Sequence, residues 1–177
     1  VRDLKESELE FAKSLTDQEN WSNSIEDWNR LFRISIPLVA YEGDNLLGIT
    51  TLFDYGNLGM IGNVVVSSNH RGKGVGLALL KESMKRLESC NTVRVHSNMD
   101  VISFYKNLDF MAEGMSTLFR LDADMKSIQP FEINADDNIV AAEGYWDEIL
   151  AMDLRQFGAD RSQFLKEING YLPECSF

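Results

Sequence analysis

The chain has 177 residues, of which 44% are hydrophobic and 25% charged, a composition typical of a water-soluble globular protein. Its length suits one domain, or one domain plus part of a second. Its net charge of −11 argues against nucleic acid as a partner, because proteins that bind the phosphate backbone need a basic surface. No apolar run approaches the roughly 20 residues that cross a bilayer and the charged N-terminus lacks the apolar core of a signal peptide, which predicts a cytoplasmic protein without a membrane partner.

Two amphipathic helices are predicted at the start of the chain. The first covers residues 4–15 and has its apolar residues on one side. The second begins after Ser24, a good N-cap residue with an acid three positions further on, and ends near Pro37. Three strands follow, at residues 38–41, 46–53 and 60–66. Short turns that contain glycine join these strands, which predicts an antiparallel meander.

The clearest helix of the sequence covers residues 74–88, with leucine and methionine on one side and charged residues on the other. A strand at residues 92–95 follows it. A helix between two strands is a crossover, so the strands on either side of it should be parallel and adjacent. A short helix at residues 100–107 and two strands at residues 110–112 and 116–121 complete an α/β (α+β) fold, whose central sheet is mixed and mostly antiparallel.

The tail is more acidic than the rest, with a net charge of −8 in residues 122–177 against −3 in residues 1–121. Its predicted elements are a strand, two helices and the start of a strand, at residues 128–133, 146–157, 160–169 and 175–177. This order repeats the layout of residues 1–41. The sequence therefore predicts a first domain over residues 1–121, followed by either the start of a second, similar lobe or a helical extension that packs on the first.

Residues with metal-binding or redox chemistry are few. The cysteines are Cys90 and Cys175 and the histidines His70 and His96, without a CxxC or a paired histidine motif. This spacing predicts no metal site, and it favours free thiols over a disulfide.

A glycine-rich, basic turn joins the strand at residues 60–66 to the long helix. Glycines at positions 72, 74 and 76 alternate with Arg71, Lys73 and Val75. Backbone N–H groups at a helix start are unpaired and carry partial positive charge, and glycine lets an anion approach them closely. The turn therefore predicts a binding site for phosphate or diphosphate.

Two other glycine-rich motifs fit this turn poorly. The sequence contains no GxxxxGK[S/T] string, so a Walker A loop is excluded. The last glycine comes one residue too early for GxGxxG, and the next strand runs into His96 and Ser97 instead of an acid that would hold a ribose.

The segment from Arg71 to Gly76 resembles the signature of the GNAT superfamily of N-acetyltransferases: Gln or Arg, two variable residues, Gly, one variable residue, and Gly or Ala. Residues 98–110 are similar to the family's N…FYxxxGF stretch, with Asp109 where glycine is usual. The resemblance covers residues 1–121. Weaker features, at residues 19–21 and 157–162, look similar to a bacterial and archaeal subgroup with two tandem lobes.

The resemblance implies that an amine attacks the thioester of acetyl-CoA directly in a ternary complex. It implies that two central strands splay apart and that pantetheine enters between them, bonded to main-chain groups of Val64 and Val66. A backbone N–H of Val65 or Val66 would polarise the thioester oxygen. The residues expected to bind the cofactor are Val64, Val65, Val66, Arg71, Gly72, Lys73, Gly74, Val75, Gly76, Asn98 and Tyr105.

Tyr105 is the expected general acid, because a phenol keeps its proton at neutral pH and can deliver it to the leaving thiolate. The alternative is a tyrosine packed in the core. Asn98 either contacts CoA or only caps the short helix. Candidates for the base are Asp54 and Glu113, with Glu19 or Asp27 near the amine's approach and His96 as a relay; each has an ordinary surface or structural role as its alternative, and water can also carry the proton.

The acceptor is expected to be a small amine or a peptide N-terminus, since an acidic surface attracts cations, although carboxylates also serve solubility alone. Two other functions stay open: a non-catalytic acyl-CoA sensor, and a scaffold without affinity for CoA. An incomplete second lobe would leave an open sheet edge that a homodimer could cover.

Overall fold

The computed structural model describes residues 1–117, 142 and 144–171. The described residues fall into two compact units, one made of residues 1–96 and 142–171 and the other of residues 97–117. Each unit is described by itself.

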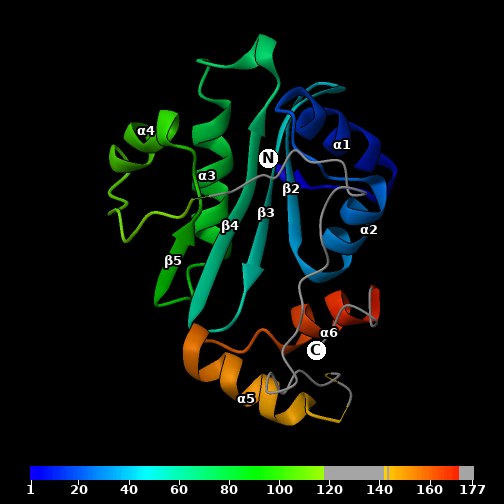
Figure 1. Ribbon diagram of the computed structural model, residues 1–177. Helices are drawn as coiled ribbons and strands as arrows, with labels where there is room; N and C mark the ends of the chain where they lie inside the picture. Colours follow the sequence, from blue (N-terminus) through cyan, green and yellow to red (C-terminus); the bar gives the residue numbers. More distant parts are fainter. Residues whose placement is uncertain (118–141, 143, 172–177) are drawn as a thin grey trace, which may run out of the picture. The chain divides into compact units, whose positions relative to one another are not determined.

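A five-stranded sheet in the order β1-β2-β3-β4-β5 forms the centre of the first unit (Figure 1). Its strands are β1 (Arg2–Asp3), β2 (Ile36–Glu42), β3 (Asn45–Asp54), β4 (Leu58–Val66) and β5 (Thr92–Val95). All neighbouring pairs are antiparallel except β4 and β5, which are parallel. The structure thus confirms the predicted mixed sheet with one parallel crossover.

Helices cover the two faces of this sheet (Figure 1). On one face lie α1 (Leu9–Gln18) and α2 (Ile25–Ile34), preceded by the short helix η1 (Glu6–Glu8). On the other lies the crossover helix α3 (Val75–Arg86), which follows η2 (Ser68–His70). Close packing explains one glycine on this second face, because a Cβ at Gly48 would lie 3.3 Å from Leu79 Cδ1 and 2.7 Å from the carbonyl oxygen of Val65.

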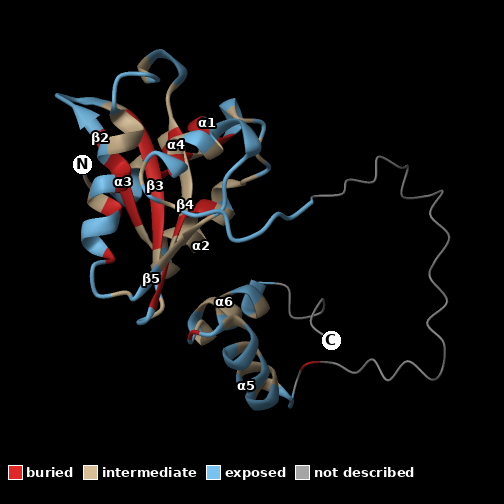
Figure 2. Cartoon of the chain, turned by 90° about the vertical axis from the view of Figure 1, so that its left-hand side faces the viewer, coloured by how far each residue is buried: buried red, intermediate tan, exposed pale blue. Residues whose placement is uncertain are grey.

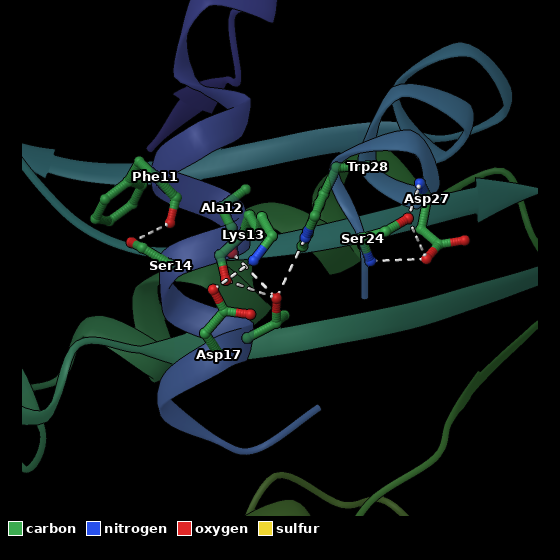
Figure 3. A network of polar contacts seen from close by, with 9 residues as sticks. Phe11, Ala12, Lys13, Ser14, Asp17, Ser24, Asp27 and Trp28 are labelled. Carbon is green, nitrogen blue, oxygen red and sulfur yellow. Dashed lines mark hydrogen bonds and ion pairs between the residues drawn. The ribbon is translucent and has the colours of Figure 1, made fainter. Parts of the chain in front are cut away.

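The core lies between the sheet and its helices, where the buried residues concentrate along β3, β4 and the inner sides of α1 and α3 (Figure 2). Trp28 on α2 is fully buried, and its Nε1 donates a hydrogen bond to Thr16 Oγ1 on α1 (3.3 Å; Figure 3). Pairing the indole N–H in this way avoids the cost of an unsatisfied buried donor.

The start of α2 is capped by the side chains of Ser24 and Asp27. The backbone N–H of Asp27 donates to Ser24 Oγ (3.1 Å), and Asp27 Oδ2 accepts from the backbone N–H of Ser24 (2.7 Å; Figure 3). This capping box confirms the helix start that the sequence predicts.

The helices α5 (Trp146–Phe157) and α6 (Ser162–Tyr171) also belong to the first unit. Rings of Phe53 and Phe164 lie 6.0 Å apart, and those of Tyr55 and Phe157 lie 5.7 Å apart, both edge to face. These aromatic pairs join the helices to the end of β3.

The second unit contains η3 (Met99–Val101) and α4 (Ile102–Lys106). The ring of Tyr105 packs between those of Phe104 and Phe110, with centroids 5.2 and 5.8 Å away. Asp109, which stands where the resembling family usually has glycine, adopts φ +64°, the left-handed conformation that aspartate tolerates less well than glycine.

Some predicted elements are wrong. Residues 110–112 and 116–117 form no strand, and the first helix is split between η1 and α1. The helix predicted at residues 160–169 begins and ends two residues later, at Ser162 and Tyr171, and the two-residue strand β1 was not predicted. The strands predicted at residues 128–133 and 175–177, the remainder of 116–121, and Cys175 lie outside the described residues.

Candidate active site

Strand β4 is longer than its parallel partner β5 and continues beyond the end of that strand. Pairing between β4 and β5 stops at Ile61 and Val95, and β4 runs on to Val66. On its other side, β4 stays paired with β3 as far as Val66. The ladder thus ends at Ile61 because β5 itself ends at Val95, and among the described residues β4 has no partner strand on this side over residues 62–66, its open edge.

The main-chain groups that face this open edge follow from the alternation of an antiparallel ladder. The N–H of Ser67 donates to Leu47 O (2.9 Å), so Ser67 and Val65 face β3. Val66 then faces the open edge, and so does the carbonyl of Val64, because it points away from the Val65 N–H across the trans peptide bond between them. In agreement, the carbonyl of Val66 accepts a hydrogen bond from Arg71 Nε (3.1 Å) instead of one from β3.

A β-bulge interrupts β4 at the closed end of the open edge. Val65 pairs with Ile49 and Gly62 with Thr51, so two residues of β4, Asn63 and Val64, stand opposite one residue of β3. Asn63 has φ +48°, and its Nδ2 donates to Thr51 Oγ1 (3.2 Å). Bulges of this kind redirect main-chain and side-chain groups and are frequent next to active sites.

In the segment after β4, the N–H groups of His70 and Arg71 donate to Ser67 O and Ser68 O, whereas those of the glycine-rich part that follows have no acceptor among the described residues. Gly72 and Gly74 have φ of +71° and +84°, and Gly74 is the N-cap of α3 without a side-chain cap. The first helical bond runs from Ala78 N–H to Gly74 O (3.0 Å). Within the described residues, the N–H groups from Gly72 to Leu77 have no acceptor. Residues 71–74 are exposed, so the turn can receive an anion from solvent.

Arg71, the predicted countercharge of this turn, already has partners. Besides its bond to Val66, it forms an ion pair with Glu19, the C-cap residue of α1. Its side chain is still 51% exposed. Lys73 lies two residues further on and is exposed. An anion that enters the turn therefore meets Lys73 and also Arg71, whose positive charge the ion pair with Glu19 partly neutralises.

Asn98 and Tyr105 belong to the second unit. Asn98 is the N-cap of η3 by its backbone, and its side chain makes no capping bond. Tyr105 is buried, and burial raises the pKa of its phenol above the ordinary value of 10.0. Because the raised pKa keeps the proton on the phenol at neutral pH, Tyr105 is in the right state for a general acid.

The proposed bases have diverse surroundings. Asp54 lies at the end of the β3–β4 ladder away from Val66, where its Oδ1 accepts from Gly56 N–H (2.8 Å) and lies 3.5 Å from Cys90 Sγ. Asp27 closes the start of α2 and pairs with Arg30. Glu113, in the second unit, and His96, directly after β5, are exposed.

The described residues hold no group of three or more His, Cys, Asp or Glu side chains that could bind a metal ion. Among the same residues, no helix has the length and apolar character that a membrane span requires.

Sequence reasoning missed two features of this site. One is the bulge at Asn63, which the pair Gly62-Asn63 could have indicated, since both residue types are disfavoured inside strands. The other is the Arg71–Glu19 ion pair, whose partners are 52 residues apart and share no local pattern.

The model of the acetyltransferase (GNAT) family matches residues 1–110 of the chain. Because this match covers more than half of the sequence, the chain belongs to the GNAT family of acetyltransferases. The expectation from the Arg71–Gly76 signature is thereby confirmed at the level of the family.

Relatives and solved structures agree with this family. The chain is similar to the uncharacterized N-acetyltransferase YitH of Bacillus subtilis, at 23% identity over 175 residues. This match covers 97% of the chain and 61% of that relative, so the chain spans about three fifths of the relative's length.

Two solved structures share the fold. An acetyltransferase of Trypanosoma brucei superposes with a TM-score of 0.55 at 24% identity, over 68% of this chain and 97% of that one. Rv2747 of Mycobacterium tuberculosis, in complex with CoA and NLQ, superposes with a TM-score of 0.56 at 20% identity, over 66% of this chain and 75% of that one.

Proposed function

We propose that this chain transfers the acetyl group of acetyl-CoA to a primary amine by direct attack in a ternary complex. The observation that carries the proposal is the combination of unpaired N–H groups at the start of α3 with an open edge on the preceding strand. The first feature suits a diphosphate and the second an extended arm with amides, and coenzyme A contains both. Family membership supports acetyl transfer.

In this proposal, the N–H groups from Gly72 to Leu77 bind the diphosphate. Arg71 and Lys73 supply positive charge, and Arg71 exchanges Glu19 for the ligand. Gly72 and Gly74 are required by their positive φ, and a Cβ at either would point into open space where the ligand approaches.

Pantetheine then extends along β4 from Val66 toward the bulge. Val66 faces the open edge close to the turn, so its N–H is suited to a pantetheine amide. The carbonyl of Val64 also faces this edge, and Val64 is further from the diphosphate, which brings it closer to the thioester. We therefore assign polarisation of the thioester oxygen to the N–H of Val64, because Val65 faces β3.

We propose Tyr105 as the group that protonates the leaving thiolate, supported by its buried, protonated phenol. Asn98 is a proposed contact of CoA, since its side chain is not used as a cap. Water takes the proton of the ammonium, and Asp54 and Glu113 are the carboxylate candidates for this role. The acceptor is a small amine or a peptide N-terminus.

We also propose that residues 1–121 form the acyl-CoA-binding lobe and that residues 122–177 extend it. The aromatic pairs that connect α5 and α6 to the end of β3 support an extension that packs on this lobe.

Calorimetric titration with acetyl-CoA tests the proposal. Wild type should bind, and Arg71→Glu should lose most of its affinity. Lys81→Glu makes the same change of charge on an exposed position of α3 and is the matched control. Equal affinity of all three proteins would contradict the proposal.

A thiol-release assay with an amine panel tests turnover. Tyr105→Phe should lower kcat by about 10²-fold or more, and because the ring is kept it should change the affinity for acetyl-CoA far less than it changes kcat. Binding without turnover by wild type would instead identify a non-catalytic acyl-CoA-binding module.

A further inference from the structure

The bulge in β4 places a polar side chain at the closed end of the open edge. Asn63 has φ +48°, a conformation that asparagine tolerates far better than most residues other than glycine. A glycine would satisfy this backbone without strain, so the backbone alone does not account for an amide side chain here.

A buried threonine fixes the orientation of the Asn63 amide. Asn63 Nδ2 donates to Thr51 Oγ1 (3.2 Å), and Thr51 is fully buried on β3. With Nδ2 directed at Thr51, the carbonyl oxygen Oδ1 has no hydrogen-bond partner among the described residues. Asn63 is partly exposed, so its Oδ1 is available to a ligand.

The amide lies on the α1–α2 face of the sheet. Thr51 alternates with Ile49, which packs in the core cluster of α1 and α2, so both side chains point to that face. The Cβ position of Gly48 and the side chain of Thr50 lie on the opposite face, toward α3. A molecule that reaches Oδ1 therefore approaches β4 from the face opposite α3.

From this arrangement we infer that Asn63 is an acceptor-binding residue, whose Oδ1 accepts a hydrogen bond from the N–H of the attacking amine. This inference rests on the proposed function, which brings the thioester to Val64, the residue next to Asn63. Thr51 is its positioning residue, since it determines which end of the amide faces the substrate.

The neutral character of this oxygen has a chemical consequence. A carboxylate at the same place would stabilise the ammonium form and raise the pKa of the amine, which cannot attack until it loses a proton. An amide oxygen orients the amine with a smaller shift toward the charged form. The site thus binds a primary amine while it keeps the reactive, neutral form within reach.

Two substitutions at position 63 test the inference in the thiol-release assay. The probes are ethanolamine, glycinamide, spermidine and a hexapeptide with a free N-terminus, and the amine with the highest wild-type rate is used throughout. Asn63→Gly keeps the positive φ and should lower kcat/KM for the amine at least about tenfold, mostly through KM, with acetyl-CoA affinity unchanged. Asn63→Asp should lower KM for the amine and shift the pH profile of kcat to higher pH.

Thr51→Val removes the hydroxyl that orients the amide and should raise KM for the amine, whereas Thr51→Ser should restore it. Thr50→Val is the matched control, because Thr50 is equally buried, donates to Gly62 O (3.0 Å) and points to the other face. It should cost stability in urea unfolding without changing KM for the amine.

Wild-type kinetics in Asn63→Gly, or an unchanged pH profile in Asn63→Asp, would overturn the inference while the proposed function stands. Equal KM changes in Thr51→Val and Thr50→Val would also overturn it, since the effect would then be structural. If wild type binds no acetyl-CoA or acetylates none of the probes, the proposed function fails and the inference fails with it.

Discussion

Helices of the same protein begin in two different ways. The starts of η1 and α2 are closed by carboxylates of the chain itself, because Glu8 accepts from Lys5 N–H (2.9 Å) and Asp27 accepts from Ser24 N–H (2.7 Å). The start of α3 has only Gly74, without a side-chain cap. An unclosed helix start is less favourable by roughly 1 kcal/mol. The starts of α1 and α5 also lack a side-chain cap, so what distinguishes α3 is the glycine-rich, basic turn before it, and the proposed binding of a diphosphate requires such an open start.

Among substitutions at the helix starts, the largest effect is expected from Gly74→Ala, which changes the open start of α3 directly. At φ +84° a Cβ costs about 1–2 kcal/mol of stability. It also points into the space where the diphosphate approaches, so the Kd for acetyl-CoA should rise at least about tenfold. Calorimetry measures the affinity and urea unfolding the stability.

Gly56→Ala is the control for Gly74→Ala. Gly56 has φ +81° and open space around its missing Cβ, and it lies in the turn between β3 and β4. It should lose similar stability and keep the affinity for acetyl-CoA. Equal losses of affinity in both variants would show that strain, and not the position at α3, causes the effect.

At the capped start of α2, Ser24→Ala should lower the stability of the protein and leave its affinity for acetyl-CoA unchanged. Loss of the Ser24 Oγ acceptor leaves the Asp27 N–H unpaired and should cost about 1 kcal/mol in urea unfolding. Affinity for acetyl-CoA should not change, since α2 binds no cofactor in this proposal. Ser24→Thr keeps the hydroxyl and should retain most of the stability. A weaker acetyl-CoA titration with Ser24→Ala would contradict the separation between the two kinds of helix start.

These contrasts show which features a sequence can predict. The capping box at Ser24 and the turn from Arg71 to Gly76 are local patterns, and both helix starts follow from them. The strand at residues 92–95 also agrees with β5, because its apolar pattern stands between clear breaks.

Features that depend on distant partners could not be predicted. Strand β1 has only two residues and exists because it pairs with β2. The strand predicted at residues 110–112 had the right composition, but no strand forms there. The pair Gly62-Asn63 could have indicated an irregular strand, but the position of the bulge depends on the β3–β4 register, which the sequence does not give.

A smaller effect is expected from Glu19→Gln, which removes the ion pair of Arg71 at the turn before α3. Glu19 pairs with Arg71 and competes with the diphosphate for its charge. Because the pair is partly exposed, its removal should lower the Kd for acetyl-CoA only about two- to fivefold. Asp17→Asn is the control, since Asp17 pairs with Lys13 on α1. A weaker affinity in Glu19→Gln would mean that Glu19 holds Arg71 in its binding position.

The smallest effect concerns pH. The hydrogen bond from Arg2 is the main cause that lowers the pKa of Glu8 from 4.5 to about 2. A lowered pKa stabilises the fold above pH 4.5, and this contribution is lost as the pH falls from 4.5 toward 2. The melting temperature of Glu8→Gln should therefore be lower than that of wild type at pH 6, and the difference should shrink toward pH 2. A difference independent of pH would contradict this origin.

The open edge of β4 also has a consequence for hydrogen–deuterium exchange. Main-chain amides that face β3, such as those of Val65 and Ser67, are held in the ladder and should exchange slowly. The amide of Val66 faces the gap beyond Ile61 and should exchange quickly in the free protein. Bound pantetheine would slow only the Val66 amide, so neighbouring residues of one strand would report whether the gap is filled.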